Sequence, residues 1–496
     1  MTHSGVPPLT LSRESGLAPP LLAQPLASFV VRSPVSCTGA TPVGEVMQAM
    51  ARESIGAMVV VDDDAKPIGV FTLRELLENV ALPGIPSSTP VERCMSRTLW
   101  TLPPAAHGFE AAILMAREGV RYVLVVDRDR LVGVVSESRL FAAWRGGIGD
   151  VSATIRAAPD VDAMVRAVGG IRELADRLLD ERMPSESVTR VITALNDLVN
   201  QRLIELVGMA EPLRAVDGAW LAFGSQGRAE QTLATDQDNG VLFADVDDPE
   251  AVRRTLLPLA TRVNEALDAC GFPLCRGEVM ASNPRWCLAL SEWRDRFAKW
   301  IDEPDPQALL NAAIFFDFRA VHGEHRHADA LRGWLAGYAQ GRGAFLLPLV
   351  QAALGSRPPL GLVRDFIVSK GGEHPGTLDL KINGIQLFVE TTRIYGLAHG
   401  VTATNTLDRL DALAAGGTLP PAEAASYAEA FRFLQFLRLR LNAAQRSRGI
   451  LAHNHLDPST LNELDRRILK EAVRQGGRLQ SRLARDFSVA QAGYGA

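Results

Sequence analysis

Two aspartates, Asp236 and Asp238, are the residues of this sequence whose spacing most clearly predicts chemistry. They directly precede an apolar run, Asn239 to Ala244, that predicts a buried strand. Because alternate residues of an extended chain point to the same face, the two carboxylates are expected to project together and to repel each other unless a cation lies between them. A hard cation such as Mg²⁺ prefers carboxylate and phosphate oxygens and keeps some of its waters. The spacing therefore predicts a magnesium site.

A turn upstream of the aspartates supplies a second element. The apolar run Ala219 to Phe223 ends at Gly224-Ser225, which predicts a strand that breaks into a turn and a short helix. Gly224 lets a ligand come close to the backbone, and the N–H groups after Ser225 could face a phosphate and favour its charge. A phosphate-facing turn beside a metal site predicts metal-assisted nucleotidyl transfer. The alternative is a β-turn and a hairpin with solvated aspartates.

The two motifs, Gly224-Ser-Gln-Gly-Arg-Ala-Glu230 and Thr235-Asp-Gln-Asp-Asn-Gly240, resemble the nucleotidyltransferase fold of the DNA-polymerase-beta superfamily. More narrowly, they resemble a bacterial family of signal-transduction nucleotidyltransferases that is similar to the PII-protein uridylyltransferases and usually carries CBS domains upstream. The resemblance implies that Asp236 and Asp238 hold Mg²⁺ on the phosphates of an NTP, either UTP or ATP. It also implies that Ser225 and its amide hold the terminal phosphates.

Two further roles follow from this resemblance. Members of the superfamily often add a third carboxylate from a neighbouring strand, and Glu278, in the strand-like run Pro273 to Met280, is the available one. A solvated glutamate on a strand would look the same. Arg228 is expected either to clamp the triphosphate or to pin the short helix to Glu230.

The region beyond the motifs also matches the family. Asp317 and Arg319 alternate with phenylalanines, so they either share a face of the site or form a buried ion pair, and the structural role is favoured. After about residue 345 the chain is predicted to be helical, with a capping box at Thr460-Leu-Asn-Glu463 opening the last helix. By analogy, this bundle closes over the active site and contacts the acceptor. Lys381 or Arg393 would then neutralise phosphate charge, although surface salt bridges explain them equally well.

An internal repeat precedes the transferase motifs. Met50 to Asp62 returns as Met115 to Asp127, and Ile68 to Thr72 returns as Val132 to Ser136. Each unit is predicted to be a helix, an apolar strand, a polar turn, a second strand and another helix. Because two such units bury each other's exposed faces, a tandem pair is the smallest stable object. The pattern resembles a CBS pair that covers residues 29–147.

CBS pairs often hold adenosyl ligands, using a Ser or Thr for phosphate and an Asp three residues later for the ribose. The corresponding residues here are Thr72 and Glu75 in the first repeat and Ser136 and Arg139 in the second. Glu75 keeps an acidic group, whereas Arg139 cannot accept a hydrogen bond from a hydroxyl but could contact phosphates. We therefore expect at most one adenosyl nucleotide per pair, in the Thr72 and Glu75 cleft. A pair that only dimerises and regulates by packing is the alternative.

The whole chain of 496 residues is too long for one core. The sequence predicts a multidomain α+β protein. Its segments are a mobile leader (1–28), the CBS pair (29–147), a helical connector (148–210), a polymerase-beta-like nucleotidyltransferase domain with a small mixed sheet (211–345) and a C-terminal helical substrate-binding bundle (346–490).

Composition excludes several other classes of protein. The net charge of −5 without a long basic block argues against a nucleic-acid partner. No apolar run has the length of a membrane span, and the N-terminus lacks the features of a signal peptide. The five cysteines are odd in number and lack CxxC spacing, which is typical of reduced thiols in a cytoplasmic protein. Irregular spacing argues against zinc in the two histidine clusters, His322, His325, His327 and His453, His455, Asp457.

The expected function is regulatory transfer of a nucleoside monophosphate from an NTP to an acceptor, which the resemblance suggests is a PII-like protein. The CBS pair would control this transfer and join two chains into a homodimer. Two alternatives remain open from the sequence. One is a sensor that binds NTP without turnover, and the other is a transferase whose acceptor is a small metabolite.

Overall fold

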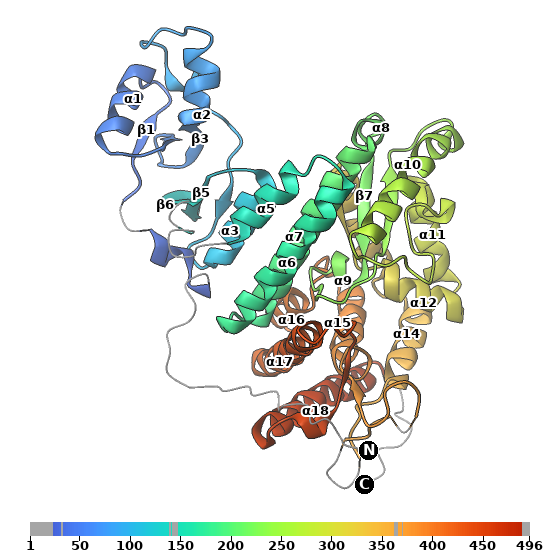
Figure 1. The fold of residues 1–496 in the computed structure, drawn as a ribbon. Helices are drawn as coiled ribbons and strands as arrows, with labels where there is room; N and C mark the ends of the chain where they lie inside the picture. Colours follow the sequence, from blue (N-terminus) through green and yellow to red (C-terminus); the bar gives the residue numbers. More distant parts are fainter. Residues whose placement is uncertain are drawn as a thin grey trace. The chain divides into compact units, whose positions relative to one another are not determined.

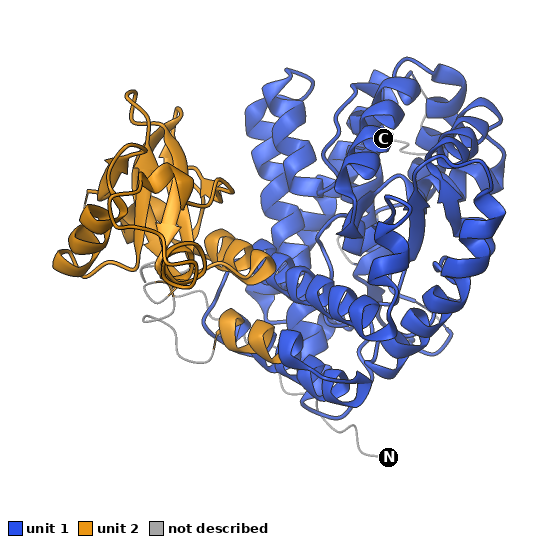
Figure 2. Ribbon diagram, turned by 90° about the horizontal axis from the view of Figure 1, so that it is seen from above, with its two compact units in different colours: residues 1–17, 155–496 blue, residues 18–154 orange. Residues whose placement is uncertain are grey.

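The computed structural model describes residues 23–30, 33–137, 140, 147–361, 366–369 and 371–488. The chain divides into two compact units, one made by residues 18–154 and one made mainly by residues 155–496 (Figure 2). Residues 1–22 of the expected leader lie outside the described part of the chain. The prediction that mobility extends to residue 28 is wrong, because Leu26 begins a short helix and is buried, and its N–H donates to the carbonyl of Ala106 at 2.6 Å.

The smaller unit repeats one arrangement twice, as the sequence predicts. Each repeat forms a three-stranded sheet in which the first pair of strands is parallel and the second is antiparallel. The first repeat contains β1 (Ser36–Thr38), α1 (Val43–Arg52), β2 (Ala57–Val61), β3 (Pro67–Thr72) and α2 (Leu73–Leu76). The second repeat contains β4 (Thr101–Leu102), α3 (Gly108–Glu118), β5 (Tyr122–Asp127) and β6 (Arg130–Ser136).

The larger unit is built on a four-stranded sheet in the order β10-β7-β8-β9. Of these strands β7 is labelled in Figure 1. β8 and β9 run parallel and the other neighbours run antiparallel, so the predicted small mixed sheet is confirmed. Every residue of β7 and β8 is buried, which explains why both read as continuous apolar runs. The strands are β7 (Ala219–Phe223), β8 (Asn239–Phe243), β9 (Cys287–Ala289) and β10 (Phe318–Gly323).

Helices surround this sheet, among them the long helix α10 (Pro249–Ala269). α7 belongs to the core of this unit as well as to the expected connector, because it packs against β10 and α10 and is buried along most of its length. The helices before the bundle are α5 (Ile148–Ala157), α6 (Val161–Asp180), α7 (Ser185–Val207), α8 (Ala210–Arg214), α9 (Gly224–Gly227), α10 (Pro249–Ala269), α11 (Leu290–Asp302), α12 (Pro306–Phe315) and α13 (His325–Ala339).

The C-terminal part is helical, as predicted, apart from one small two-stranded sheet. The predicted capping box of the last helix is wrong, because the N-cap lies two residues after Thr460. Asn462 is the N-cap and its side chain accepts from the N–H of Asp465 at 2.8 Å, whereas Thr460 lies in the preceding 3-10 turn. The elements are α14 (Gly343–Gly355), β11 (Leu378–Asp379), η6 (Lys381–Ile385), α15 (Gln386–Ala398), α16 (Thr406–Ala415), α17 (Pro421–Arg446), β12 (His455–Leu456) and α18 (Glu463–Asp486).

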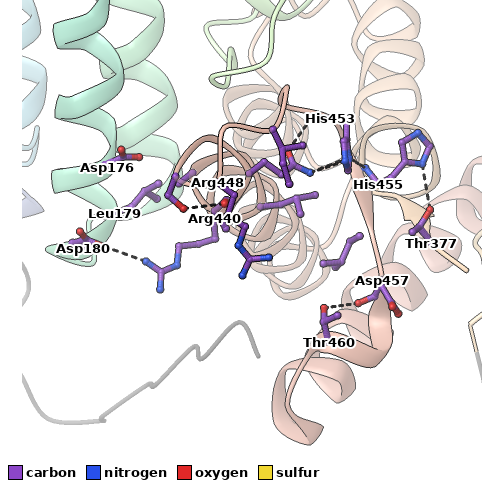
Figure 3. A pocket seen from close by; sticks show the side chains of 17 residues that line it. Asp176, Leu179, Asp180, Thr377, Arg440, Arg448, His453, His455, Asp457 and Thr460 are labelled. Carbon is purple, nitrogen blue, oxygen red and sulfur yellow. Dashed lines mark hydrogen bonds and ion pairs between the residues drawn. The ribbon is translucent and has the colours of Figure 1, made fainter. Parts of the chain in front are cut away.

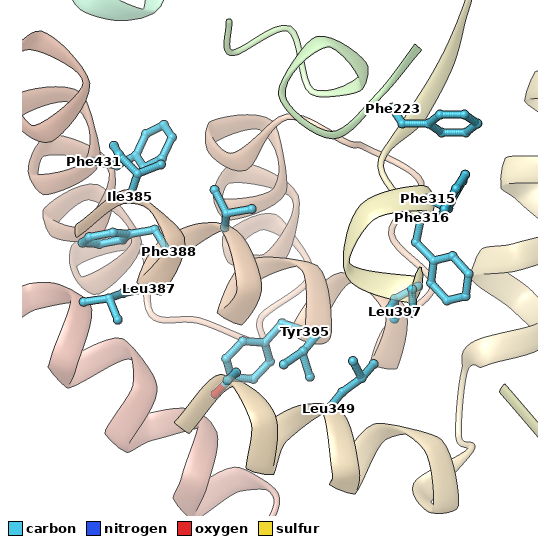
Figure 4. Packing of buried hydrophobic residues seen from close by; sticks show 14 of the residues in the cluster. Phe223, Phe315, Phe316, Leu349, Ile385, Leu387, Phe388, Tyr395, Leu397 and Phe431 are labelled. Atoms are coloured by element: carbon cyan, nitrogen blue, oxygen red, sulfur yellow. The ribbon is translucent and has the colours of Figure 1, made fainter. Parts of the chain in front are cut away.

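One hydrophobic core runs from the sheet into the helical bundle (Figure 4). Phe223, at the end of β7, stacks edge-on against Phe315 with ring centroids 4.7 Å apart. Phe316 continues the chain of rings to Phe345 of α14, at 6.0 Å. Because these contacts bury aromatic area from both sides, the sheet and the bundle are parts of one packed body.

A buried ion cluster around Asp317 joins the same two parts. Its Oδ2 accepts from Nη1 of Arg228 at 2.9 Å and from Nε of Arg393 at 3.0 Å, and its Oδ1 accepts from Arg409 at 2.5 Å. Burial alone would raise the pKa of Asp317, but the three guanidiniums outweigh it and hold that pKa well below its usual range. One fully buried carboxylate therefore links the turn after β7 to α15 and α16.

We expect Asp317→Asn to lower the free energy of unfolding by about 3–5 kcal/mol, because it leaves buried guanidiniums without a counter-charge. Urea unfolding followed by tryptophan fluorescence measures the loss. The pKa of Asp317 is lower in the folded than in the unfolded protein. Its ion pairs therefore stabilise the folded state at neutral pH, and this stabilisation is lost as the pH falls below about 4, where the carboxyl of the unfolded chain protonates first. The wild type and the variant should therefore converge in acid.

The control for this prediction is Asp302→Asn, which removes an exposed carboxylate paired with Arg342 on the same unit. That change should cost at most about 1 kcal/mol, since solvent screens the pair. Equal losses for the two variants would contradict a central role for Asp317.

Candidate metal and nucleotide site

Asp236, Asp238 and Cys275 bring one side-chain ligand atom each to a common point. These atoms, two carboxylate oxygens and a sulfur, all lie within 4.8 Å of one another. No other three His, Cys, Asp or Glu side chains meet this criterion in the described part of the chain. Asp236 is exposed, whereas Asp238 and Cys275 are partly buried. The predicted convergence of the two carboxylates is therefore present in the structure, with a thiol as third member.

The residue between the two aspartates explains their alignment. Gln237 is buried and points away from the group, where its Nε2 donates to the carbonyls of Asn264 and Phe272 at 3.0 Å each. Nδ2 of Asn264 in turn donates to Oε1 of Gln237 at 2.7 Å and to Oδ1 of Asn239 at 2.9 Å. Gln237 and Asn239 thus face inward while the aspartates between and before them face outward.

Charge repulsion inside the group is visible in the pKa of Asp238, which rises to about 6. Burial is the largest cause and the neighbouring Asp236 carboxylate is the next, while the Cys275 hydrogen bond and the positive fields of Lys381 and Arg228 oppose them. A bound cation would relieve both unfavourable effects. Two carboxylates and a thiol at this spacing fit a divalent metal ion.

Glycines hold the turn after β7 close to this group. Gly224 has a φ of +56°, and a Cβ there would come within 3.4 Å of Oδ2 of Asp238. A Cβ on Gly227 would lie 2.1 Å from the backbone oxygen of Asp317, so α9 can pack on the ion cluster only with glycine. Ser225 begins the turn between these two glycines and is partly exposed. The turn therefore lies between two sets of side chains. One is the group formed by Asp236, Asp238 and Cys275, called the metal group below, and the other is the ion cluster around Asp317, on which the turn packs.

The helical bundle adds positive charge to the site through two residues, Lys381, which the sequence singled out, and Arg438, which it did not. Lys381, at the start of η6, is exposed and acts electrostatically on Asp238. Arg438 of α17 is 5% exposed, its Nε donates to Oδ1 of Asn454 at 2.6 Å, and burial lowers its pKa to about 10. Asp379 and Asp236 oppose that lowering, so Arg438 also lies within the field of the site. No motif marked Arg438, because α17 carries several arginines.

The structure does not bring Glu278 to the aspartates. The predicted strand at 273–280 is wrong, because these residues form a loop in which Glu278 is exposed and has a φ of +56°. The carbonyl of Glu278 accepts from Nε1 of Trp286 at 2.9 Å and from Nδ2 of Asn283 at 3.1 Å. These bonds hold the loop in an irregular path that places Cys275 next to Asp238.

Arg228 and Arg319, which the sequence also singled out, form ion pairs within the protein. Arg228 is paired to Glu230 at 2.8 Å as well as to Asp317, which matches the helix-pinning alternative. Burial lowers the pKa of Arg228, but the two carboxylates outweigh that effect and raise it. Arg319 pairs with Asp197 of α7 at 2.7 Å.

In the first CBS repeat, Thr72 and Glu75 satisfy each other. Thr72 is the N-cap of α2, where its side chain accepts from the N–H of Arg74 at 3.1 Å and Glu75 accepts from the N–H of Thr72 at 3.0 Å. A ligand at this cleft must compete with that capping box. Ser136 is the last residue of β6, and Arg139 lies outside the described residues.

The second histidine cluster lines a cavity of about 580 Å³ between α6 and the end of α17 (Figure 3). His453 and His455 contribute to its wall together with Asp457. Nε2 of His455 lies 3.9 Å from Oδ2 of Asp379, and the ring of His374 stacks on His455 with centroids 4.2 Å apart. These contacts account for the histidines as stacked and hydrogen-bonded side chains.

Family models match most of the chain. Residues 169–307 match the model described as "Putative nucleotidyltransferase DUF294", and residues 343–487 match "Putative nucleotidyltransferase substrate binding domain". Residues 26–82 and 91–146 each match the CBS domain model. The chain joins a CBS pair to a nucleotidyltransferase-like domain that matches the DUF294 model. The metal group and the turn after β7 lie inside the first match, and Lys381 and Arg438 lie inside the second.

Individual relatives cover much less of the chain. Uncharacterized protein MK0525 of Methanopyrus kandleri is 31% identical over 94 residues, which are 18% of this chain and 48% of that protein. The chain thus spans about half the length of this curated relative. Solved structures that match include an uncharacterized conserved protein from Pyrococcus horikoshii (28% identity, 25% of this chain and 94% of that chain, TM-score 0.24) and the CBS domain protein PAE2072 from Pyrobaculum aerophilum complexed with AMP (24% identity, 23% and 89%, TM-score 0.22).

None of the helices that the structure describes is both long and apolar enough to cross a membrane. All five cysteines are free thiols, as expected.

We expect Asp238→Asn to stabilise the metal-free protein by roughly 1 kcal/mol at neutral pH, because it removes a partly buried charge that repels Asp236. The pKa of Asp238 is higher in the folded than in the unfolded protein, and this difference sets the direction in which stability changes with pH. Protonation of Asp238 favours the folded state fully below about pH 4, and this advantage is lost as the pH rises through about 6. Thermal unfolding in chelator should therefore show a higher Tm for the variant above pH 6, and no difference below about pH 4.

Asp247→Asn is the matched control, since Asp247 is an exposed carboxylate beyond the other end of β8. It should leave the Tm unchanged at every pH. A variant at 238 that is less stable than the wild type in chelator would show that the aspartate is held by partners other than a metal ion.

Proposed function

We propose that this chain is a Mg²⁺-dependent nucleotidyltransferase that moves a nucleoside monophosphate from an NTP to an acceptor under the control of its CBS pair. The observation that carries the proposal is the convergence of the Asp236 and Asp238 carboxylates beside the Gly224-Ser225 turn. This arrangement lies in a segment that matches a nucleotidyltransferase model. The raised pKa of Asp238 supports it, because a charged pair held at a cost to stability is typical of a functional site.

In this mechanism the side chains of the chain bind and orient the nucleotide. Asp236 and Asp238 would hold the metal ion, which would supply positive charge for an in-line displacement. Ser225 and its amide hold the terminal phosphates, while Lys381 and Arg438 neutralise phosphate charge from the side of the bundle. The acceptor oxygen forms a bond to the α-phosphorus, the bond to pyrophosphate breaks, and the acceptor proton leaves to solvent.

The finer part of the proposal concerns the acceptor and the nucleotide. A protein acceptor of the PII type, modified with UTP or ATP, is the first candidate, since the bundle matches a substrate-binding domain model. A small-metabolite acceptor is the alternative that the same bundle could serve. A nucleotide sensor without turnover is a second candidate function. The finding that Cys275 rather than a third carboxylate completes the group favours it.

The CBS part of the proposal is a cytoplasmic homodimer that binds at most one adenosyl nucleotide per pair. The cleft is the one formed with Thr72 and Glu75, where a ribose hydroxyl would replace the N–H of Thr72 as a donor to the Glu75 carboxylate. Binding there alters transfer only if the nucleotide prefers one arrangement of the larger unit over another.

The assignment of the metal site is tested by the double variant Asp236→Asn with Asp238→Asn. We expect it to remain folded and to lose Mg²⁺-dependent binding of both ATP and UTP, because neutral amides cannot replace two carboxylates around a hard cation. Isothermal calorimetry with and without Mg²⁺ measures this, and Asp247→Asn serves as the control that keeps wild-type binding. If the folded double variant bound ATP and UTP with unchanged Mg²⁺-dependent affinity, the assignment of Asp236 and Asp238 as metal ligands would be wrong.

Transfer itself is tested by incubating the full chain with each NTP and Mg²⁺ and with candidate acceptors, PII-like proteins first. Mass spectrometry should show an acceptor that is heavier by one nucleoside monophosphate, together with released pyrophosphate. Metal-dependent binding of NTP without pyrophosphate release from any acceptor would favour the sensor.

The CBS expectation is tested by titrating AMP into the double variant, in which the transferase site no longer competes. One AMP per chain, lost on Glu75→Gln and retained on Glu78→Gln, is the expected result. Glu78 is an exposed neighbour that pairs with Arg74. Two equivalent AMP sites per chain would contradict the proposed cleft.

A further inference from the structure

We propose that Cys275 is a metal ligand, so that this site prefers thiophilic divalent ions such as Co²⁺, Zn²⁺ and Cd²⁺ over Mg²⁺. The inference rests on the proposed function in one respect, namely that Asp236 and Asp238 bind a metal ion. It goes further by naming a third ligand and the class of metal that this ligand selects.

The position of Cys275 is fixed by the same network that fixes the aspartates. The N–H of Gln237 donates to the carbonyl of Pro273 at 3.3 Å, and its side chain donates to the carbonyl of Phe272 at 3.0 Å. The carbonyl of Cys275 itself accepts from the N–H of Glu278 at 2.9 Å. Gln237, which lies between the two aspartates, therefore ties their segment to the loop that carries the thiol.

The spacing of the three ligand atoms fits a shared ion. Oxygen and sulfur ligands lie about 2.0–2.3 Å from a bound Zn²⁺, so two ligands of one ion are roughly 3–4.5 Å apart. The three atoms of this group already lie within 4.8 Å of one another. The group needs only a small contraction to surround an ion.

The chemistry of sulfur sets the preference. Thiolate is a soft ligand that binds zinc and related ions well, whereas Mg²⁺ takes oxygen ligands. With a carboxylate in place of Cys275, all three side-chain ligand atoms would be oxygens, which suit Mg²⁺. The thiol therefore shifts the preference of the site towards softer ions without preventing the aspartates from holding Mg²⁺ when it is abundant.

The neighbouring cysteines have a different environment. Cys270 and Cys287 are 3% and 0% exposed, as expected for thiols that fill a core. Cys275 is partly exposed and hydrogen-bonded to Asp238. Packing alone accounts for the first two cysteines and does not account for the contact that Cys275 makes.

The test is a titration of the full chain with Co²⁺, followed by absorption spectroscopy. Co²⁺ bound to a thiolate gives a charge-transfer band in the near ultraviolet in addition to its weak visible bands. We expect the wild type and Cys270→Ser to show the near-ultraviolet band and Cys275→Ser to lose it while the visible bands remain. Cys275→Ser should also lower the affinity for Cd²⁺ by roughly 10- to 100-fold more than the affinity for Mg²⁺.

Each other result has a distinct meaning. A near-ultraviolet band that survives Cys275→Ser, or visible bands without that band in the wild type, would overturn the thiol ligand while leaving the aspartate site intact. A wild-type chain that binds no Co²⁺ at all would overturn the proposed function as well. ¹¹³Cd NMR of the wild type reports a sulfur ligand by its chemical shift, so the inference can fail even where the variant does not fold.

Discussion

The buried carboxylate of Asp317 is the interaction on which the arrangement of the site depends. It lies directly before β10, and it binds arginines from the turn after β7 and from two helices of the bundle. Removing four charged groups from water costs several kcal/mol per ion, and the hydrogen bonds within the cluster offset that cost only when all partners are in place. The cluster therefore fixes one relative position of the sheet and the bundle, which a continuous apolar core alone would specify less strictly.

That fixed position has a consequence for chemistry. The segments that flank the sheet carry Asp236, Asp238 and Cys275, while the bundle carries Lys381 and Arg438. Negative and positive charge thus come from different parts of one packed body. The glycine turn after β7 lies between the ion cluster and the group formed by Asp236, Asp238 and Cys275.

Much of this arrangement could be predicted from the sequence, because it follows from local patterns. The apolar runs at 219–223 and 239–243 are buried strands, and the spacing of Asp236 and Asp238 brings their carboxylates together. The repeat in the first 140 residues gives two equivalent sheets for the same reason. Patterns of this kind depend on the period of the backbone, which the sequence displays directly.

The parts that the sequence did not reveal depend on long-range contacts. The run at 273–280 is predicted as a strand from its sequence, yet bonds from Asn283 and Trp286 to one carbonyl hold it as a loop. Cys275 thereby reaches the aspartates in place of Glu278. Arg438 carries no local signal either, since its role depends on where α17 packs.

The measurement that tests the account most directly is a crystal structure of the full chain with Mn²⁺ and a non-hydrolysable NTP, with anomalous diffraction used to locate the metal. The account predicts an anomalous peak in contact with Asp236, Asp238 and a phosphate oxygen, with the triphosphate between the turn after β7 and Lys381. A nucleotide bound elsewhere, or an ordered triphosphate with no metal at the aspartates, would contradict it.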